Sequence, residues 1–166
     1  MTSVLYSDIS SLVTNDQGLE LGLLGELKDA ALVIENGHIS WLGSAKEAPE
    51  ADQTLSLEGS SVIPGFVDSH AHLVFAGNRA EEFAARMNGE NYTAGGIRNT
   101  VSATRSASDE ELDENIATLA IEMYRSGITT FETKSGYGLN VFDETRSVRL
   151  AAQHTEDVTF LGAHVI

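Results

Sequence analysis

The stretch PGFVDSHAHL, residues 64–73, decides the fold of this chain. It opens with proline and glycine, continues with apolar residues and ends in polar ones, which predicts a buried strand with functional side chains at its carboxyl end. Residues two apart on a strand point to the same face, so His70 and His72 can both turn toward one metal ion. Taken alone, a His-x-His pattern more often marks two hydrogen-bonded histidines than a metal site.

The sequence after this stretch alternates between helical and strand-like segments. Residues 81–87 predict a short helix and residues 88–96 a loop. Ser108, with Glu111 three residues later, is typical of a helix N-terminus, and a long amphipathic helix follows. The next segments, residues 128–133, 145–153 and 158–164, predict a strand, a helix and a strand. This order favours right-handed βαβ units on a parallel sheet, with the histidine pair at the face where (β/α)8 barrels carry their active sites.

The sequence before the stretch has a different texture, with short strands and turns. Residues 30–34 and 39–43 predict two strands, and the Asn36-Gly37 pair between them is a strong hairpin signal. We therefore expect two domains: a small β module over residues 1–61 and an α/β domain over residues 62–166.

The composition excludes several classes of function. The 166 residues include 25 acidic and 10 basic side chains, for a net charge of −15, which argues against nucleic-acid or anionic-lipid partners. There is no cysteine, so any metal must be held by His, Asp or Glu. Neither a signal peptide nor an apolar run long enough for a membrane is visible, so we expect a cytoplasmic protein without membrane contact.

Residues 64–72 resemble the PGxxDxHxH signature of the amidohydrolase superfamily, which also follows a small β module. Four further segments are similar to the imidazolonepropionase family and occur in the same order: residues 73–83, 100–105, 134–139 and 160–164. The resemblance extends more loosely to the N-terminal module and so covers essentially the whole chain. It implies the α/β fold of a metal-dependent hydrolase. This fold is a (β/α)8 TIM-like barrel, of which residues 62–166 are the first part, preceded by a small β-sandwich.

The resemblance also implies roles for individual residues. His70 and His72 would bind one metal ion per chain, Zn²⁺ or Fe, because two imidazoles do not separate these metals. The implied substrate contacts are Arg79, Tyr137, His164 and Tyr92. Arg79 offers a planar fork for a carboxylate. Spacing alone leaves His164 open as a third metal ligand, and residues 91–96 look shorter than the loop usual in the family.

The family's reaction is the hydrolysis of the cyclic amide C–N bond of 4-imidazolone-5-propanoate to N-formimidoyl-L-glutamate, in histidine degradation. The family's remaining metal ligands and its general base are expected beyond Ile166, so we expect residues 1–166 alone to be inactive. Two alternatives stay open. One is another amidohydrolase, such as a deaminase or a dihydroorotase-like cyclic amidase; the other is a non-catalytic truncated fragment. A small-molecule substrate and a homodimer are the expected partners.

Overall fold

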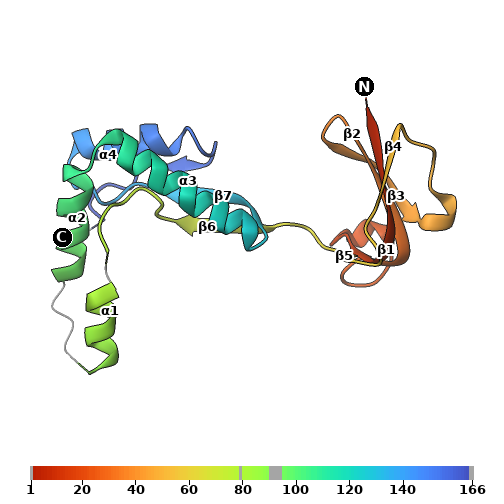
Figure 1. Ribbon diagram of the computed structural model, residues 1–166, viewed down its shortest axis with the longest axis horizontal. Coiled ribbons are helices and arrows are strands. Elements are labelled where there is room, and N and C mark those ends of the chain that lie inside the picture. Colours follow the sequence, from red (N-terminus) through yellow and green to blue (C-terminus); the bar gives the residue numbers. More distant parts are fainter. Residues whose placement is uncertain (1, 79, 90–94, 165–166) are drawn as a thin grey trace. The chain divides into compact units, whose positions relative to one another are not determined.

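The chain folds into two compact units, residues 1–64 and 65–166 (Figure 1). Each unit has its own hydrophobic core. The computed structural model describes residues 2–78, 80–89 and 95–164. No helix in these three ranges is both long and apolar enough to cross a membrane.

The first unit is built on one five-stranded sheet in the order β3-β2-β1-β4, with β5 also paired to β1. The strands are β1 (Ser3–Val13), β2 (Glu26–Glu35), β3 (His38–Ser44), β4 (Gln53–Ser56) and β5 (Ser61–Val62), with short 3-10 turns η1 (Gln17–Leu19) and η2 (Ala45–Glu47). The pairs β1–β2 and β2–β3 are antiparallel, whereas β4 and β5 run parallel to β1. The core of the unit contains Ile9, Leu12, Ala30 and Leu32.

The predicted hairpin is confirmed. Asn36 and Gly37 join β2 to β3 and both have positive φ, 53° and 78°, which suits a tight turn whose twist matches the strands. The long first strand β1 was not identified from the sequence, although it pairs with three other strands. The five strands form one sheet by their hydrogen bonds, and the β-sandwich stays a prediction.

The second unit contains a parallel three-stranded sheet in the order β6-β7-β8, which confirms the predicted parallel arrangement. Its strands are β6 (Phe66–Ala71), β7 (Ile128–Lys134) and β8 (Val158–Thr159), and its helices are α1 (Ala80–Met87), α2 (Gly95–Ser106), α3 (Asp109–Arg125) and α4 (Val141–Ala151). α3 and α4 pack beside each other and against β7 (Figure 1). The core between them is formed by Leu73, Val74, Leu112, Ile116, Ala120, Phe131, Leu150 and Ala151.

Local sequence explains where α3 begins and which face it buries. The Ser108 hydroxyl accepts a hydrogen bond from the Glu111 backbone N–H at 3.1 Å, which confirms the predicted N-cap. The buried residues Leu112, Ile116 and Ala120 recur every four positions, so one stripe of the helix faces the core.

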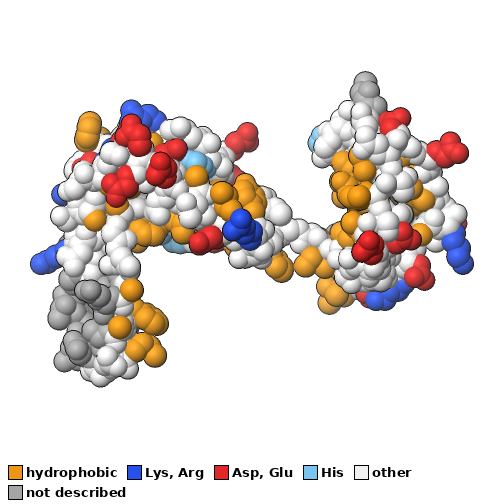
Figure 2. Space-filling view, in the orientation of Figure 1, with side chains coloured by type: hydrophobic (Ala, Val, Ile, Leu, Met, Phe, Trp, Pro, Cys, Tyr) orange, Lys and Arg blue, Asp and Glu red, His pale blue; other side chains and the backbone are white. Residues whose placement is uncertain are grey.

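Several sequence-based boundaries were wrong. Helix α2 was not identified, and α4 begins at Val141 rather than Thr145 because the Asn140 side chain caps it by accepting a hydrogen bond from the Asp143 N–H. The last strand ends at Thr159 rather than His164. Strand β6 was expected to be buried, yet Val67 is 68% exposed. Within the described residues β6 pairs with β7 alone, which leaves its other edge open. Exposed hydrophobic side chains also line α1 (Figure 2).

Candidate metal and substrate site

The two histidines lie at the carboxyl end of β6, where side chains accept hydrogen bonds from the backbone N–H groups of His70 and Leu73. The Asp68 carboxylate accepts a hydrogen bond from the His70 N–H at 3.0 Å. The hydroxyl of Thr133, a fully buried residue of β7, accepts one from the Leu73 N–H at 3.0 Å. The segment between these two anchors is therefore held in one path across the end of the sheet.

The imidazole rings of His70 and His72 are close enough to share an ion. Their centroids are 5.4 Å apart and their planes are tilted by 60°. Two imidazoles bound to one tetrahedral zinc, with Zn–N distances of about 2.0–2.1 Å, have centroids roughly 5 Å apart. The pair therefore fits the spacing that a shared metal ion requires.

The His72 ring carries a nitrogen suited to metal binding. Its Nδ1 atom is buried and has no hydrogen-bond partner among the described residues. Burial lowers the pKa of His72, and the neighbouring rings of His164 and His70 lower it further, while a backbone hydrogen bond with Ser135 acts in the opposite direction. The lowered pKa favours the neutral imidazole, the form that binds metal ions.

Tyr137 and His164 join the same cluster of rings. Tyr137 lies in the loop between β7 and α4, with its ring centroid 5.5 Å from that of His72. The His164 ring lies 4.7 Å from His72 and 5.7 Å from Tyr137. His164 was expected to close the last strand, but it follows a turn after β8 and still reaches the cluster.

The predicted residues are thus only partly brought together within the described structure. His70, His72, Tyr137 and His164 lie side by side, whereas Arg79 and Tyr92 fall outside the described residues. Across the described part of the chain, no group of three or more His, Asp or Glu side chains is arranged to hold a metal ion. His164 therefore does not complete a three-ligand site with the pair.

Sequence reasoning missed the ion pair between Glu132 and Lys134 on β7. The Thr159 hydroxyl also donates a hydrogen bond to the Glu132 carboxylate. The hydrogen bond from Lys134 lowers the pKa of Glu132 most, followed by the hydrogen bond from Thr159, and the charges of Lys134 and His70 lower it further. Glu132 and Lys134 alternate along β7 with the buried Phe131 and Thr133, so both charged residues lie on the face away from the helices. This period of two in the sequence could have predicted that they share a face.

Comparison with known proteins shows what the chain is similar to. A scan against models of protein families found no match. The chain is 59% identical to an imidazolonepropionase of Mycolicibacterium smegmatis and 56% identical to one of Streptomyces griseus, and both alignments cover 100% of the chain. Over its whole length the chain is similar to these imidazolonepropionases. It spans 42% and 43% of the length of these two relatives and corresponds to their N-terminal part.

Several solved structures of hydrolases have a fold similar to that of this chain. A triazine hydrolase variant matches with a TM-score of 0.58 at 18% identity, over 98% of the chain and 36% of that structure. An atrazine chlorohydrolase from Arthrobacter aurescens, complexed with zinc, matches with a TM-score of 0.53 at 19% identity, over 90% of the chain and 33% of that structure. At these identities the likeness concerns the fold alone.

Proposed function

We propose that the protein hydrolyses the cyclic amide C–N bond of 4-imidazolone-5-propanoate to N-formimidoyl-L-glutamate, in histidine degradation. The observation that carries this proposal is the cluster of His70, His72, Tyr137 and His164, in which the buried His72 Nδ1 has no partner among the described residues. The names of the relatives and their identity to the chain support the same activity.

His70 and His72 would hold one Zn²⁺ or Fe ion per chain. When bound, the ion would supply Lewis-acid activation of a water molecule, whose pKa falls to about 7 at such sites. The zinc in the related atrazine chlorohydrolase structure supports this choice of metal. The neutral state favoured at His72 keeps a lone pair available at neutral pH.

The other residues would bind and orient the substrate. The hydroxyl of Tyr137 and the ring nitrogens of His164 can form hydrogen bonds to the polar edges of an imidazolone, and both rings already border the metal-binding pair. Arg79 would pair with the propanoate carboxylate, and Tyr92 would add a further contact. Ground-state contacts of this kind fix the scissile bond beside the nucleophile.

The fold assignment completes the proposal. Residues 62–166 would form the first part of a (β/α)8 barrel, with the site at the carboxyl ends of its strands, and residues 1–61 would form a small β-sandwich. The parallel order β6-β7-β8 and the position of the histidines at the carboxyl end of β6 support this arrangement.

The test is a substrate comparison with the full-length protein. Purified enzyme is incubated with 4-imidazolone-5-propanoate, with dihydroorotate and with an amino-substituted heterocycle, and the products are followed by mass spectrometry and by ammonia release. We expect N-formimidoyl-L-glutamate from the first substrate at a rate far above the others. Ammonia release, or faster opening of dihydroorotate, would assign the protein to a different amidohydrolase reaction.

A further inference from the structure

The loop between β7 and α4 carries Tyr137, and it packs tightly on the first turn of α4. A Cβ atom added to Gly138 would lie 2.5 Å from the backbone nitrogen of Glu144. Leu139 has a φ of 55°, a left-handed conformation that residues other than glycine rarely adopt. A backbone in this conformation persists only where its surroundings hold it.

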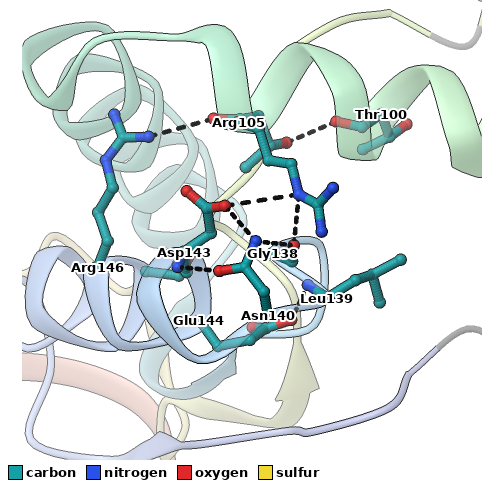
Figure 3. Close-up of polar contacts among 10 residues, drawn as sticks. Thr100, Arg105, Gly138, Leu139, Asn140, Asp143, Glu144 and Arg146 are labelled. Carbon is teal, nitrogen blue, oxygen red and sulfur yellow. Dashed lines mark hydrogen bonds and ion pairs between the residues drawn. The ribbon is translucent and has the colours of Figure 1, made fainter.

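A single peptide group of this loop is held from both ends. The Gly138 carbonyl oxygen accepts a hydrogen bond from Arg105 Nε at 2.6 Å, and the Leu139 N–H donates one to Glu144 Oε1 at 2.7 Å (Figure 3). The carbonyl and the N–H belong to the same peptide bond. A guanidinium at the end of α2 and a carboxylate at the start of α4 therefore fix the orientation of the peptide plane one residue after Tyr137.

The carboxylate in this arrangement is deeply buried. Glu144 is 2% exposed, and its second oxygen, Oε2, has no hydrogen-bond partner among the described residues. Burying a carboxylate is costly unless it gains specific interactions. A nonpolar residue would fill the same place in the helix packing, so helix stability alone does not account for a carboxylate here.

We propose that Arg105 and Glu144 are positioning residues, a peptide clamp that holds the Tyr137 ring against His72 and His164. The proposal rests on the substrate contact assigned to Tyr137 under the proposed function. The clamp acts through the loop, since neither side chain belongs to the ring cluster. Its loss frees the peptide between Gly138 and Leu139 to rotate and lets Tyr137 leave its place.

The first test replaces Glu144 in the full-length enzyme. Glu144→Leu removes the acceptor for the Leu139 N–H, whereas Glu144→Gln keeps an acceptor oxygen and should rescue the loop. Ser147→Ala is the matched control, because Ser147 is buried on the same helix and its hydroxyl donates a hydrogen bond to the Asp143 carbonyl rather than to the loop. Kinetics are measured below the unfolding temperature of every variant, alongside hydrogen exchange of residues 135–140.

Glu144→Leu should raise KM roughly tenfold or more, with kcat within about threefold of wild type, because a ground-state contact is misplaced. It should also speed hydrogen exchange in residues 135–140. Glu144→Gln and Ser147→Ala should keep wild-type KM and exchange. A Glu144→Leu enzyme with a KM within about twofold of wild type, or with unchanged exchange in the loop, overturns the proposal.

A second pair of variants tests the other half of the clamp. Arg105→Met removes the shorter of two hydrogen bonds to the Gly138 carbonyl, the other being donated by Asn140 Nδ2 at 3.4 Å. Arg146→Met removes a more buried arginine that bonds Asp109 and the Ala107 carbonyl instead. Only Arg105→Met should raise KM and exchange in the loop. If the protein fails to open the imidazolone ring, the proposed function fails, and exchange alone then decides the clamp. If the ring opens but Arg105→Met and Arg146→Met behave alike, the clamp fails and the proposed function stands.

Discussion

The rings of His72 and His164 lie 4.7 Å apart, although one residue follows β6 and the other follows β8, the two outer strands of the sheet. A glycine just after the middle strand, β7, leaves room for this contact. Gly136 follows β7 with a φ of +142°, and a Cβ atom placed there would lie 3.1 Å from Cγ of His164. The absence of a side chain at position 136 therefore lets His164 reach the cluster.

Gly136→Ala should displace His164 and reduce activity. The variant should also lose about 1 kcal/mol of stability, because alanine is strained at positive φ. Gly37→Ala is the matched control, since Gly37 has a φ of +78° and no atom within 4 Å of the added Cβ. Thermal unfolding and kcat/KM of both variants separate the effects. Equal activity in the two variants would show that the contact between position 136 and His164 has no bearing on catalysis.

The histidine pair should account for the metal content. Full-length protein should purify with close to one zinc or iron ion per chain, and the double variant His70→Ala, His72→Ala should lose both the ion and the activity. Removing both histidine ligands leaves too few donor atoms for tight metal binding. His38→Ala, at an exposed position on β3, serves as the control. Metal analysis that finds the same content in the double variant would refute the assignment of these ligands.

Asp109 should make stability depend on pH in the acid range. The hydrogen bond from Arg146 holds the pKa of Asp109 below its usual 3.8, and the charges of Arg146 and Arg149 act in the same direction. A lowered pKa contributes stability that is present above the usual value and is lost as the pH falls through the folded-state pKa. Asp109→Asn should therefore destabilise the protein at neutral pH, and its deficit relative to wild type should shrink on acidification.

Urea unfolding at about pH 7 and about pH 3 measures this change. The control is Glu110→Gln, which removes one charge from an exposed position in the same helical turn. A deficit of Asp109→Asn that is equal at both pH values would exclude the ion pairs with the two arginines as its origin.

Residues 1–166 produced alone should not turn over 4-imidazolone-5-propanoate. The described residues offer two histidines to a metal and no larger group of ligands. The open edge of β6, with Phe66 56% exposed, should also promote self-association through unpaired backbone groups. Light scattering and a turnover assay measure both properties. A stable monomer with turnover would mean that these residues contain a complete active site.

The features predicted correctly from the sequence are those set by local patterns. Asn36-Gly37 predicts the hairpin because both residues tolerate positive φ. Ser108 predicts the start of α3 because its hydroxyl accepts a hydrogen bond from a nearby backbone N–H. Helix α2 was not predicted because Gly95, Gly96 and several Ser and Thr residues are weak helix formers. Its Thr104 hydroxyl instead bonds the Thr100 carbonyl and the Ala76 N–H, a tertiary contact that sequence periodicity does not report.

In the candidate site, too, local spacing predicted some features, whereas contacts between separate elements were missed. A period of two along β6 was enough to pair His70 with His72. The family resemblance led us to expect Tyr137 and His164 near the pair. The sequence pattern also predicted that His164 ends the last strand, which was wrong, because His164 lies beyond β8. The contacts of Glu132 with Thr159 and of Glu144 with Leu139 depend on distances across different elements, which residue spacing does not encode.

The hydroxyl of Thr133, which lies in the core, accepts a hydrogen bond from the Leu73 N–H. This bond links β7 to the segment that follows β6, directly after His72. Valine has nearly the same shape as threonine but no hydroxyl, so it would pack well and still leave a buried N–H without an acceptor. If the hydrogen bond rather than the shape of the side chain matters at position 133, related sequences should keep a hydroxyl there. Relatives that keep the histidine path should retain threonine or serine here, and a shift to valine should accompany a different course of the chain after β6.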